Sequence, residues 1–286
     1  MPITIKTKEE IALLREGGRR LAAVLRQVTD AARPGISTKA LDDIAEDLIL
    51  RSGGTPAFKG YRVHGTDVAY PATICTSVND EVVHAIPRLD VILKQGDIVG
   101  IDIGMWYPGK REDGSRKSEM RSQKQILQHP ASGIQPSMVT DMAVTVPVGA
   151  VSQEAEHLMR ATKDALGIAI ASVCPGIHIG DIGYAVSQRL KQDHLGIIRD
   201  LAGHGVGYAL HEEPFIPNLG KPGTGPELKT GMVLAIEPMA TLGDWRVVLQ
   251  DDEWTFRTLD GSLAAHFEHT IVVTKDGVGV LTALDN

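Results

Sequence analysis

Apolar residues recur at helical spacing in the first fifty residues of the chain. Thr7 and Glu10 have the spacing of a capping box, in which two side chains bond free amides of the first helical turn. The apolar positions that follow recur close to the 3.6-residue period and predict a helix that stops before Pro34. They are Ile11, Leu14, Leu21, Val24, Leu25 and Val28. Residues 41–49 continue the pattern and predict a second helix that ends at Gly53.

The same order returns in the second half of the chain. Ser152 is expected to cap a third helix, which stops at Pro175, and Asp181 is expected to cap a fourth. The apolar stripes are Leu158, Ala161, Ala165 and Ala169 in the third helix and Ile182, Ala185, Val186 and Leu190 in the fourth. Pro34 and Pro175 each begin a Pro-Gly-Ile stop, so the helical pattern repeats at an offset of 141 residues.

Strand-like apolar runs that contain an acid also occur in pairs. The aligned segments are 93–102 with 228–237, 141–146 with 268–273, and 84–87 with 211–214. Together with the helices, these matches in one order indicate a duplicated α+β unit, in which antiparallel strands form one sheet covered by two helix pairs. We therefore expect one domain, residues 1–286, made of halves at about 1–149 and 150–286, with a polar basic insertion at about 105–136.

Composition narrows the function classes. The formal net charge of -7 argues against broad nucleic-acid binding, which usually needs a basic face. Two cysteines are too few for a disulfide framework, and the sequence contains no signal peptide and no apolar run of membrane-spanning length. We expect a cytoplasmic protein without membrane contact.

Four acids stand in these apolar strand-like segments at repeat-related positions: Asp102, Asp141, Glu237 and Glu268. A carboxylate in an apolar strand is costly unless it is paired or bound to metal, and four facing one another would repel strongly. Two divalent cations would offset their four negative charges. Imidazole suits Mn, Fe, Co and Zn, and two segments compete to supply it.

The two candidate imidazoles are His204, which lies among glycines, and His211, which is followed by Glu-Glu-Pro. The chain has no HExxH helix, which excludes a zincin. The glycine-rich stretch also lacks the spacing and the lysine of a phosphate-binding loop.

Six motifs taken together resemble type I methionine aminopeptidases. They are Ser77 to Pro87, Gly96 to Asp102, Gly203 to Gly207, His211 to Pro214, Ile236 to Met239, and Phe267 to Thr274. The resemblance runs from the first helix to Val273. It implies the pseudo-symmetric pita-bread fold and removal of the initiator methionine from nascent proteins and peptides with a small second residue. It also implies two divalent ions, of Co, Mn, Fe or Zn.

The resemblance assigns roles to particular residues. The implied metal ligands are Asp102, Asp141, His204, Glu237 and Glu268. Glu237 is also implied to relay a proton, while His84 and His211 are implied to hydrogen-bond the substrate. The implied walls of the methionine pocket are Tyr61, Tyr70, Cys75, Leu210 and Trp254. By residue type alone, these apolar side chains would be ordinary core.

Three features depart from the family, one of them a short extra stretch from Arg62 to Ala69 next to the implied pocket. Asp102 and Asp141 lie 39 residues apart, where family members have a short hairpin, and Leu210 replaces an aromatic residue. Asp141 is the only acid between Pro136 and the next helix, so it remains the expected ligand.

Two alternatives stay open. An X-Pro aminopeptidase or prolidase shares the ligands but usually carries an additional N-terminal domain. A non-enzymatic ribosome-binding relative should have lost ligands, yet all five positions are filled. Residues 110–124 hold six Lys/Arg and three acids, and a solvated loop or a ribosome contact would each account for them. We expect a monomer.

Overall fold

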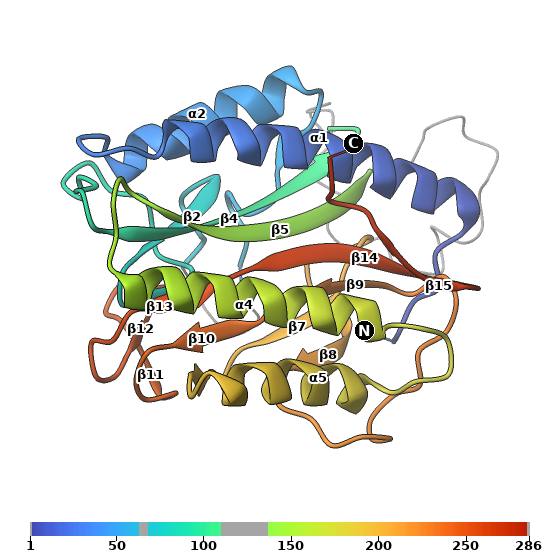
Figure 1. The fold of residues 1–286 in the computed structure, drawn as a ribbon. Coiled ribbons are helices and arrows are strands. Elements are labelled where there is room, and N and C mark those ends of the chain that lie inside the picture. Colours follow the sequence, from blue (N-terminus) through green and yellow to red (C-terminus); the bar gives the residue numbers. More distant parts are fainter. Residues whose placement is uncertain (1, 63–67, 110–136, 285–286) are drawn as a thin grey trace.

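Residues 2–62, 68–109 and 137–284 are described in the computed structural model of the chain, which Figure 1 shows. Within these ranges the four expected helices are present. They are α1 (Lys8–Ala31), α2 (Thr38–Arg51), α4 (Gln153–Ser172) and α5 (Ile179–Gln192). The predicted insertion falls mostly on residues 110–136, which lie outside the described ranges.

The helix starts test the predicted caps. Thr7 Oγ1 accepts from the Glu10 amide at 3.3 Å and Glu10 Oε2 accepts from the Thr7 amide at 2.8 Å, which confirms the capping box. Ser152 caps α4 as predicted. The prediction for Asp181 is wrong, because His178 is the N-cap and Asp181 is the third helical residue. Its carboxylate accepts from the His178 amide at 2.7 Å, as an acid at that position can.

One large antiparallel sheet carries strands from both halves of the chain. Its path is β1-β4-β5-β14-β9-β7-β8, with β2 beside β4 and β15 beside β14. These strands are β1 (Thr55–Pro56), β2 (Ile74–Val78), β4 (Ile98–Tyr107), β5 (Met138–Pro147), β7 (Ala202–Gly205), β8 (Glu212–Pro217), β9 (Val233–Ile236), β14 (Glu268–Thr274) and β15 (Gly277–Val280). The halves meet where β5 pairs with β14.

Two small sheets complete the strand set. One has the order β13-β10-β6 and the other β11-β12-β3. Their strands are β3 (Glu81–Val83), β6 (Gly196–Ile197), β10 (Met239–Thr241), β11 (Val247–Leu249), β12 (Phe256–Thr258) and β13 (Ala264–His266).

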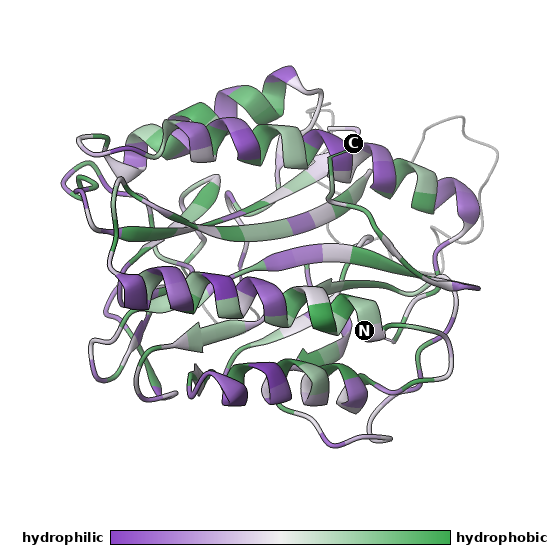
Figure 2. Cartoon of the chain, in the orientation of Figure 1, coloured by the Kyte–Doolittle hydropathy of each residue, from purple (hydrophilic) through white to green (hydrophobic). Residues whose placement is uncertain are grey.

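The two helix pairs pack on the sheet and bury the predicted stripes. α1 lies over β4 and β5 with α2 beside it against β1 and β2, while α4 and α5 lie over the second half (Figure 1). Each pair encloses its own apolar core, centred on residues such as Leu25 and Ile101 in the first half and Leu158 and Ile271 in the second. Figure 2 shows that every helix carries both hydrophilic and hydrophobic positions, as a helix with one buried face should. This confirms the α+β architecture.

The pairing of β4 with β5 is long and regular. It runs without a break from Ile98 opposite Pro147 to Tyr107 opposite Met138. Residues 105–107 therefore belong to a strand, although they fall within the range expected for the insertion. Among the described residues, no helix has the length and apolar character needed to cross a membrane.

Candidate metal centre

Strand register places three of the four predicted acids on one face of the sheet. Asp102 lies opposite Ala143, and Ala143 lies opposite Glu268 on the next strand. Asp102, Ala143 and Glu268 therefore form a row across β4, β5 and β14, so the two acids share one face. Asp141 lies opposite Gly104, two positions from Asp102, and therefore points to the same side. The 39-residue separation of the two aspartates does not keep them apart, because their strands are neighbours.

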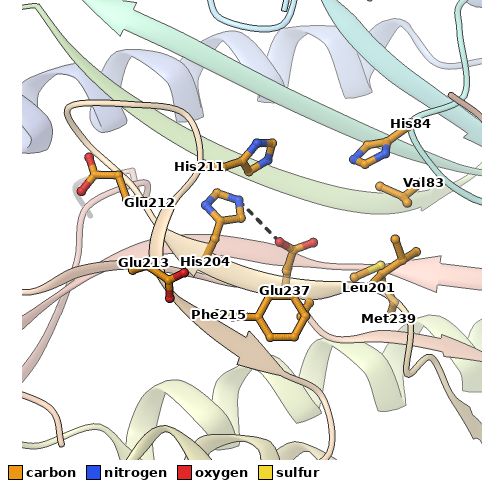
Figure 3. A pocket seen from close by; sticks show the side chains of 11 residues that line it. Val83, His84, Leu201, His204, His211, Glu212, Glu213, Phe215, Glu237 and Met239 are labelled. Carbon is orange, nitrogen blue, oxygen red and sulfur yellow. Dashed lines mark ion pairs between the residues drawn. The ribbon is translucent and has the colours of Figure 1, made fainter. Parts of the chain in front are cut away.

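His204 and Glu237 approach these acids from the other half. His204 stands on β7 opposite Ala235, and Glu237 directly follows β9. His204 Nε2 lies 3.6 Å from Glu237 Oε1, the contact drawn in Figure 3, and 4.0 Å from Asp141 Oδ2. Asp141, His204 and Glu268 each offer a ligand atom, and these atoms lie within 4.8 Å of one another. The five residues predicted as ligands are thus brought together.

The His204 ring turns its Nε2 toward the carboxylates. Its Nδ1 lies 2.9 Å from the carbonyl oxygen of Gly205, so the ring proton belongs on Nδ1 as a donor to that acceptor. The lone pair is then on Nε2, the atom that faces the carboxylates. Burial lowers the pKa of His204 to about 4, which keeps the ring neutral at physiological pH, as a ligand must be.

The carboxylates are in an environment that favours protonation or a cation. Burial raises the pKa of Asp102 to about 6 and holds the pKa of Glu237 well above its usual range. Burial together with the neighbouring carboxylates does the same for Asp141 and Glu268. Within the described residues, no hydrogen-bond partner reaches Asp102 Oδ1, Asp141 Oδ1 or Glu268 Oε1. Buried oxygens of this kind suit a divalent metal ion, so the donor set fits the predicted cofactor.

His84 lies at the entrance to this cluster. It follows β3 with a φ of 59°, an unusual conformation for a residue other than glycine. The rings of Trp254 and Phe256 contact its ring edge to face, at centroid distances of 6.4 and 6.1 Å. Burial and the nearby histidines lower the pKa of His84 to about 3, so its imidazole is neutral at physiological pH.

His211 stands across the entrance from His84 (Figure 3). Tyr61 Oη lies 2.6 Å from His211 Nδ1, and the His211 ring is 4.4 Å from that of His204. Both histidines line a pocket of about 330 Å³ that also includes Phe215, which is 57% exposed at its edge. The two residues predicted to contact substrate therefore border one cavity next to the acids.

The predicted walls of the methionine pocket also come together. A second cavity beside the acids is lined by all of them: Tyr61, Tyr70, Cys75, Leu210 and Trp254. Phe58 is a further wall residue that the sequence did not indicate. A Cβ at Gly104 would lie 2.7 Å from Phe58 Cε1, so this glycine makes room for the ring.

His266 is a second residue that the sequence analysis missed. It is 3% exposed, and its Nε2 lies 3.5 Å from Glu237 Oε2. The available signal was its position two residues before Glu268, since alternate residues of an extended chain share a face. The apolar neighbours of Glu268 obscured it.

Comparison with known proteins gives consistent results. The sequence profile of metallopeptidase family M24 matches residues 12–117 and 131–275. Methionine aminopeptidase from Aquifex aeolicus is 40% identical over 99% of this chain and 100% of its own length. Methionine aminopeptidase 1 from Mycobacterium tuberculosis is 41% identical over 96% of this chain and 92% of its own.

Solved structures of related proteins show the same fold as this chain. The crystal structure of methionine aminopeptidase from Thermotoga maritima has a TM-score of 0.84 and 39% identity, covering 98% of this chain and 99% of that one. The prolidase from Pyrococcus horikoshii has a TM-score of 0.71 at 19% identity, and the match covers 99% of this chain and 64% of the prolidase. That second likeness shows a shared fold alone.

Proposed function

This chain belongs to metallopeptidase family M24 and, within it, to the methionine aminopeptidases, and we propose that it uses two divalent ions to remove the N-terminal methionine. The antiparallel sheet and two helix pairs of this chain agree with the pita-bread fold of that family. The proposed substrates are nascent proteins and peptides with a small second residue. The observation that carries the metal proposal is the group of buried carboxylate oxygens that find no hydrogen-bond partner among the described residues.

The proposed ligands are Asp102, Asp141, His204, Glu237 and Glu268. Four ionised carboxylates packed together carry four negative charges, which two divalent cations would balance. Asp141, His204 and Glu268 each have a ligand atom within 4.8 Å of the others, and Asp102 lies on β4, beside the strand of Asp141. Co, Mn, Fe and Zn all tolerate this mixture of oxygens and one imidazole. When bound, the ions would supply positive charge that acidifies water and stabilises developing negative charge.

The protein's own groups would position the substrate and move the proton. Glu237 would accept a proton from the attacking water and return it to the leaving amine nitrogen. His84 would hydrogen-bond the scissile nitrogen. His211 would donate to the carbonyl oxygen, and a Tyr61 hydroxyl that donates to Nδ1 would leave the required proton on Nε2. The apolar cavity, with Cys75 and Trp254 among its walls, suits an unbranched thioether.

Release of methionine from a Met-Gly-containing peptide tests the proposal. We expect release to stop after dialysis against EDTA and to return when Mn or Co is added. Release that continues unchanged after metal removal would contradict the metal requirement. An Ala-Pro-containing peptide in the same assay addresses the X-Pro aminopeptidase or prolidase alternative, and we expect little cleavage of it.

The remaining sequence-based expectations stay predictions. Contact with the ribosome through residues 110–124 concerns a segment outside the described residues. Co-sedimentation with ribosomes, with and without residues 106–136, would test it and with it the ribosome-binding alternative. A monomeric state would be checked by light scattering and a cytoplasmic location by cell fractionation.

A further inference from the structure

His266 is a buried imidazole directed at a proposed metal ligand without being one of the five. It ends β13 and lies opposite Met239, which is two residues beyond Glu237. Glu237 and His266 are therefore held near each other by the β10–β13 pairing. The side chain of His266 is 3% exposed and that of Glu237 is 11% exposed.

The backbone of His266 is fixed by a threonine from the other half of the chain. The His266 amide donates to Thr145 Oγ1 at 2.9 Å, and the same hydroxyl donates to the His266 carbonyl at 2.9 Å. Thr145 belongs to β5, the strand that carries Asp141. This paired contact ties the position of the His266 ring to the strand that carries a proposed ligand.

The two oxygens of Glu237 face different imidazoles. Oε1 lies 3.6 Å from His204 Nε2, and Oε2 lies 3.5 Å from His266 Nε2. No hydrogen-bond partner for His266 Nε2 is present in the part of the chain that the structure describes. A separation of 3.5 Å is a few tenths of an ångström too long for an N–H···O bond, so a small rotation of either side chain would complete one.

We propose that His266 positions Glu237 for metal binding by donating its Nε2–H to Glu237 Oε2. This inference rests on the metal site proposed above. The donor fixes the plane of the carboxylate and leaves Oε1, beside His204, as the oxygen available to an ion. Partners of this kind, one shell outside the metal, typically change metal affinity 10–100-fold when they are removed.

The chemistry distinguishes this role from direct ligation by the His266 imidazole. A glutamine at position 266 keeps an N–H donor but is a poor replacement for an imidazole ligand. His266→Gln should therefore retain what His266→Ala loses. An imidazole that ligates directly would leave both variants equally impaired.

The experiment measures metal binding as well as turnover. Protein stripped with EDTA is titrated with Mn or Co by calorimetry. For His266→Ala we expect the dissociation constant of one ion to rise about 10–100-fold, and for His266→Gln to stay within roughly threefold of the original. His269→Gln is a matched control, because that ring lies on β14 and contacts Thr282 at 2.9 Å. Its metal affinity should not change.

A double variant tests whether His266 acts through Glu237. In a Glu237→Ala background, His266→Ala should weaken the remaining metal binding no further, because the acceptor is already gone. Thermal unfolding of each stripped variant checks that the fold is intact.

Three results would overturn the positioning role: unchanged affinity in His266→Ala, failure of His266→Gln to restore binding, or a full additional loss in the Glu237→Ala background. Original protein that binds neither Mn nor Co would instead defeat the metal site itself.

Discussion

Replacing Glu212 by glutamine should destabilise the protein by an amount set by the buried ion pair that it breaks. Lys6 Nζ lies 2.6 Å from Glu212 Oε2, and both side chains are 1% exposed. Glu212 Oε2 also accepts from the Thr4 hydroxyl at 2.6 Å, and Oε1 accepts from the backbone amides of Tyr208 at 2.5 Å and Ala209 at 3.0 Å. One carboxylate therefore ties the N-terminal segment to the loop that carries the adjacent His211.

The magnitude follows from what remains after the substitution. The Lys6 ammonium would stay buried beside the Thr4 hydroxyl and the Tyr208 ring, 4.8 Å from Nζ to the centroid, without its counter-ion. Burial already lowers the pKa of Lys6 and Glu212 opposes that effect, so removing the carboxylate leaves an uncompensated charge. Removal of one partner from such a pair costs about 3–5 kcal/mol, whereas replacing both partners costs far less.

The assay is urea unfolding of metal-free protein followed by circular dichroism. We expect Glu212→Gln to lose about 3–5 kcal/mol and Lys6→Met/Glu212→Gln to recover most of that loss. Because Glu212 adjoins His211, kcat should also fall, roughly 10–100-fold for a displacement near 1 Å. Lys59→Met is the matched control: Lys59 pairs with Glu46 at 2.7 Å on the surface, and its loss should cost at most about 1 kcal/mol. A single-variant cost no larger than this control, or strictly additive costs, would refute the reasoning.

Three further predictions concern the site. Because burial raises the pKa of Asp102 to about 6 from 3.8, a proton competes with metal below that pH. The Mn-induced rise in Tm should therefore shrink as the pH falls through about 6; a pH-independent rise would contradict this. His84→Ala should lower kcat about 10²–10⁴-fold with metal content unchanged, so unaltered turnover would remove its role. Gly104→Ala should displace Phe58, cost about 1–3 kcal/mol and raise KM for Met-Gly peptides, whereas an unchanged KM would show that the ring adapts.

Patterns within one segment predicted the fold well. The helical stripes and stops depend on neighbouring residues, so they could be read directly, as Leu158 and Ala165 in α4 illustrate. The start of α5 was misplaced because a carboxylate can serve a helix either as the N-cap or, like Asp181, from the third position. Local sequence favours the two positions almost equally.

The candidate site was predictable to the extent that duplication reveals it. Asp102 and Glu237 occupy matching positions in the two halves, and that repetition distinguished them from ordinary strand-end acids. Residues outside the repeat gave no comparable signal. The Lys6–Glu212 contact joins residues 206 positions apart, and the space that Phe58 occupies depends on Gly104, a glycine of β4.

The contact between the two halves explains why the sequence repeat alone could not predict the geometry of the site. The acids of the two halves form one group because β5 pairs with β14. That pairing has only two registered positions, and threonine hydroxyls from both strands add hydrogen bonds across it. Thr145 of the first half bonds the backbone of His266 in the second, and Thr270 of the second bonds the Asp141 amide at 3.0 Å and its carbonyl at 2.7 Å in the first. Each threonine can make these hydrogen bonds only when the partner segment from the other half lies beside it. The arrangement of the proposed ligands therefore depends on reciprocal contacts that neither half encodes by itself.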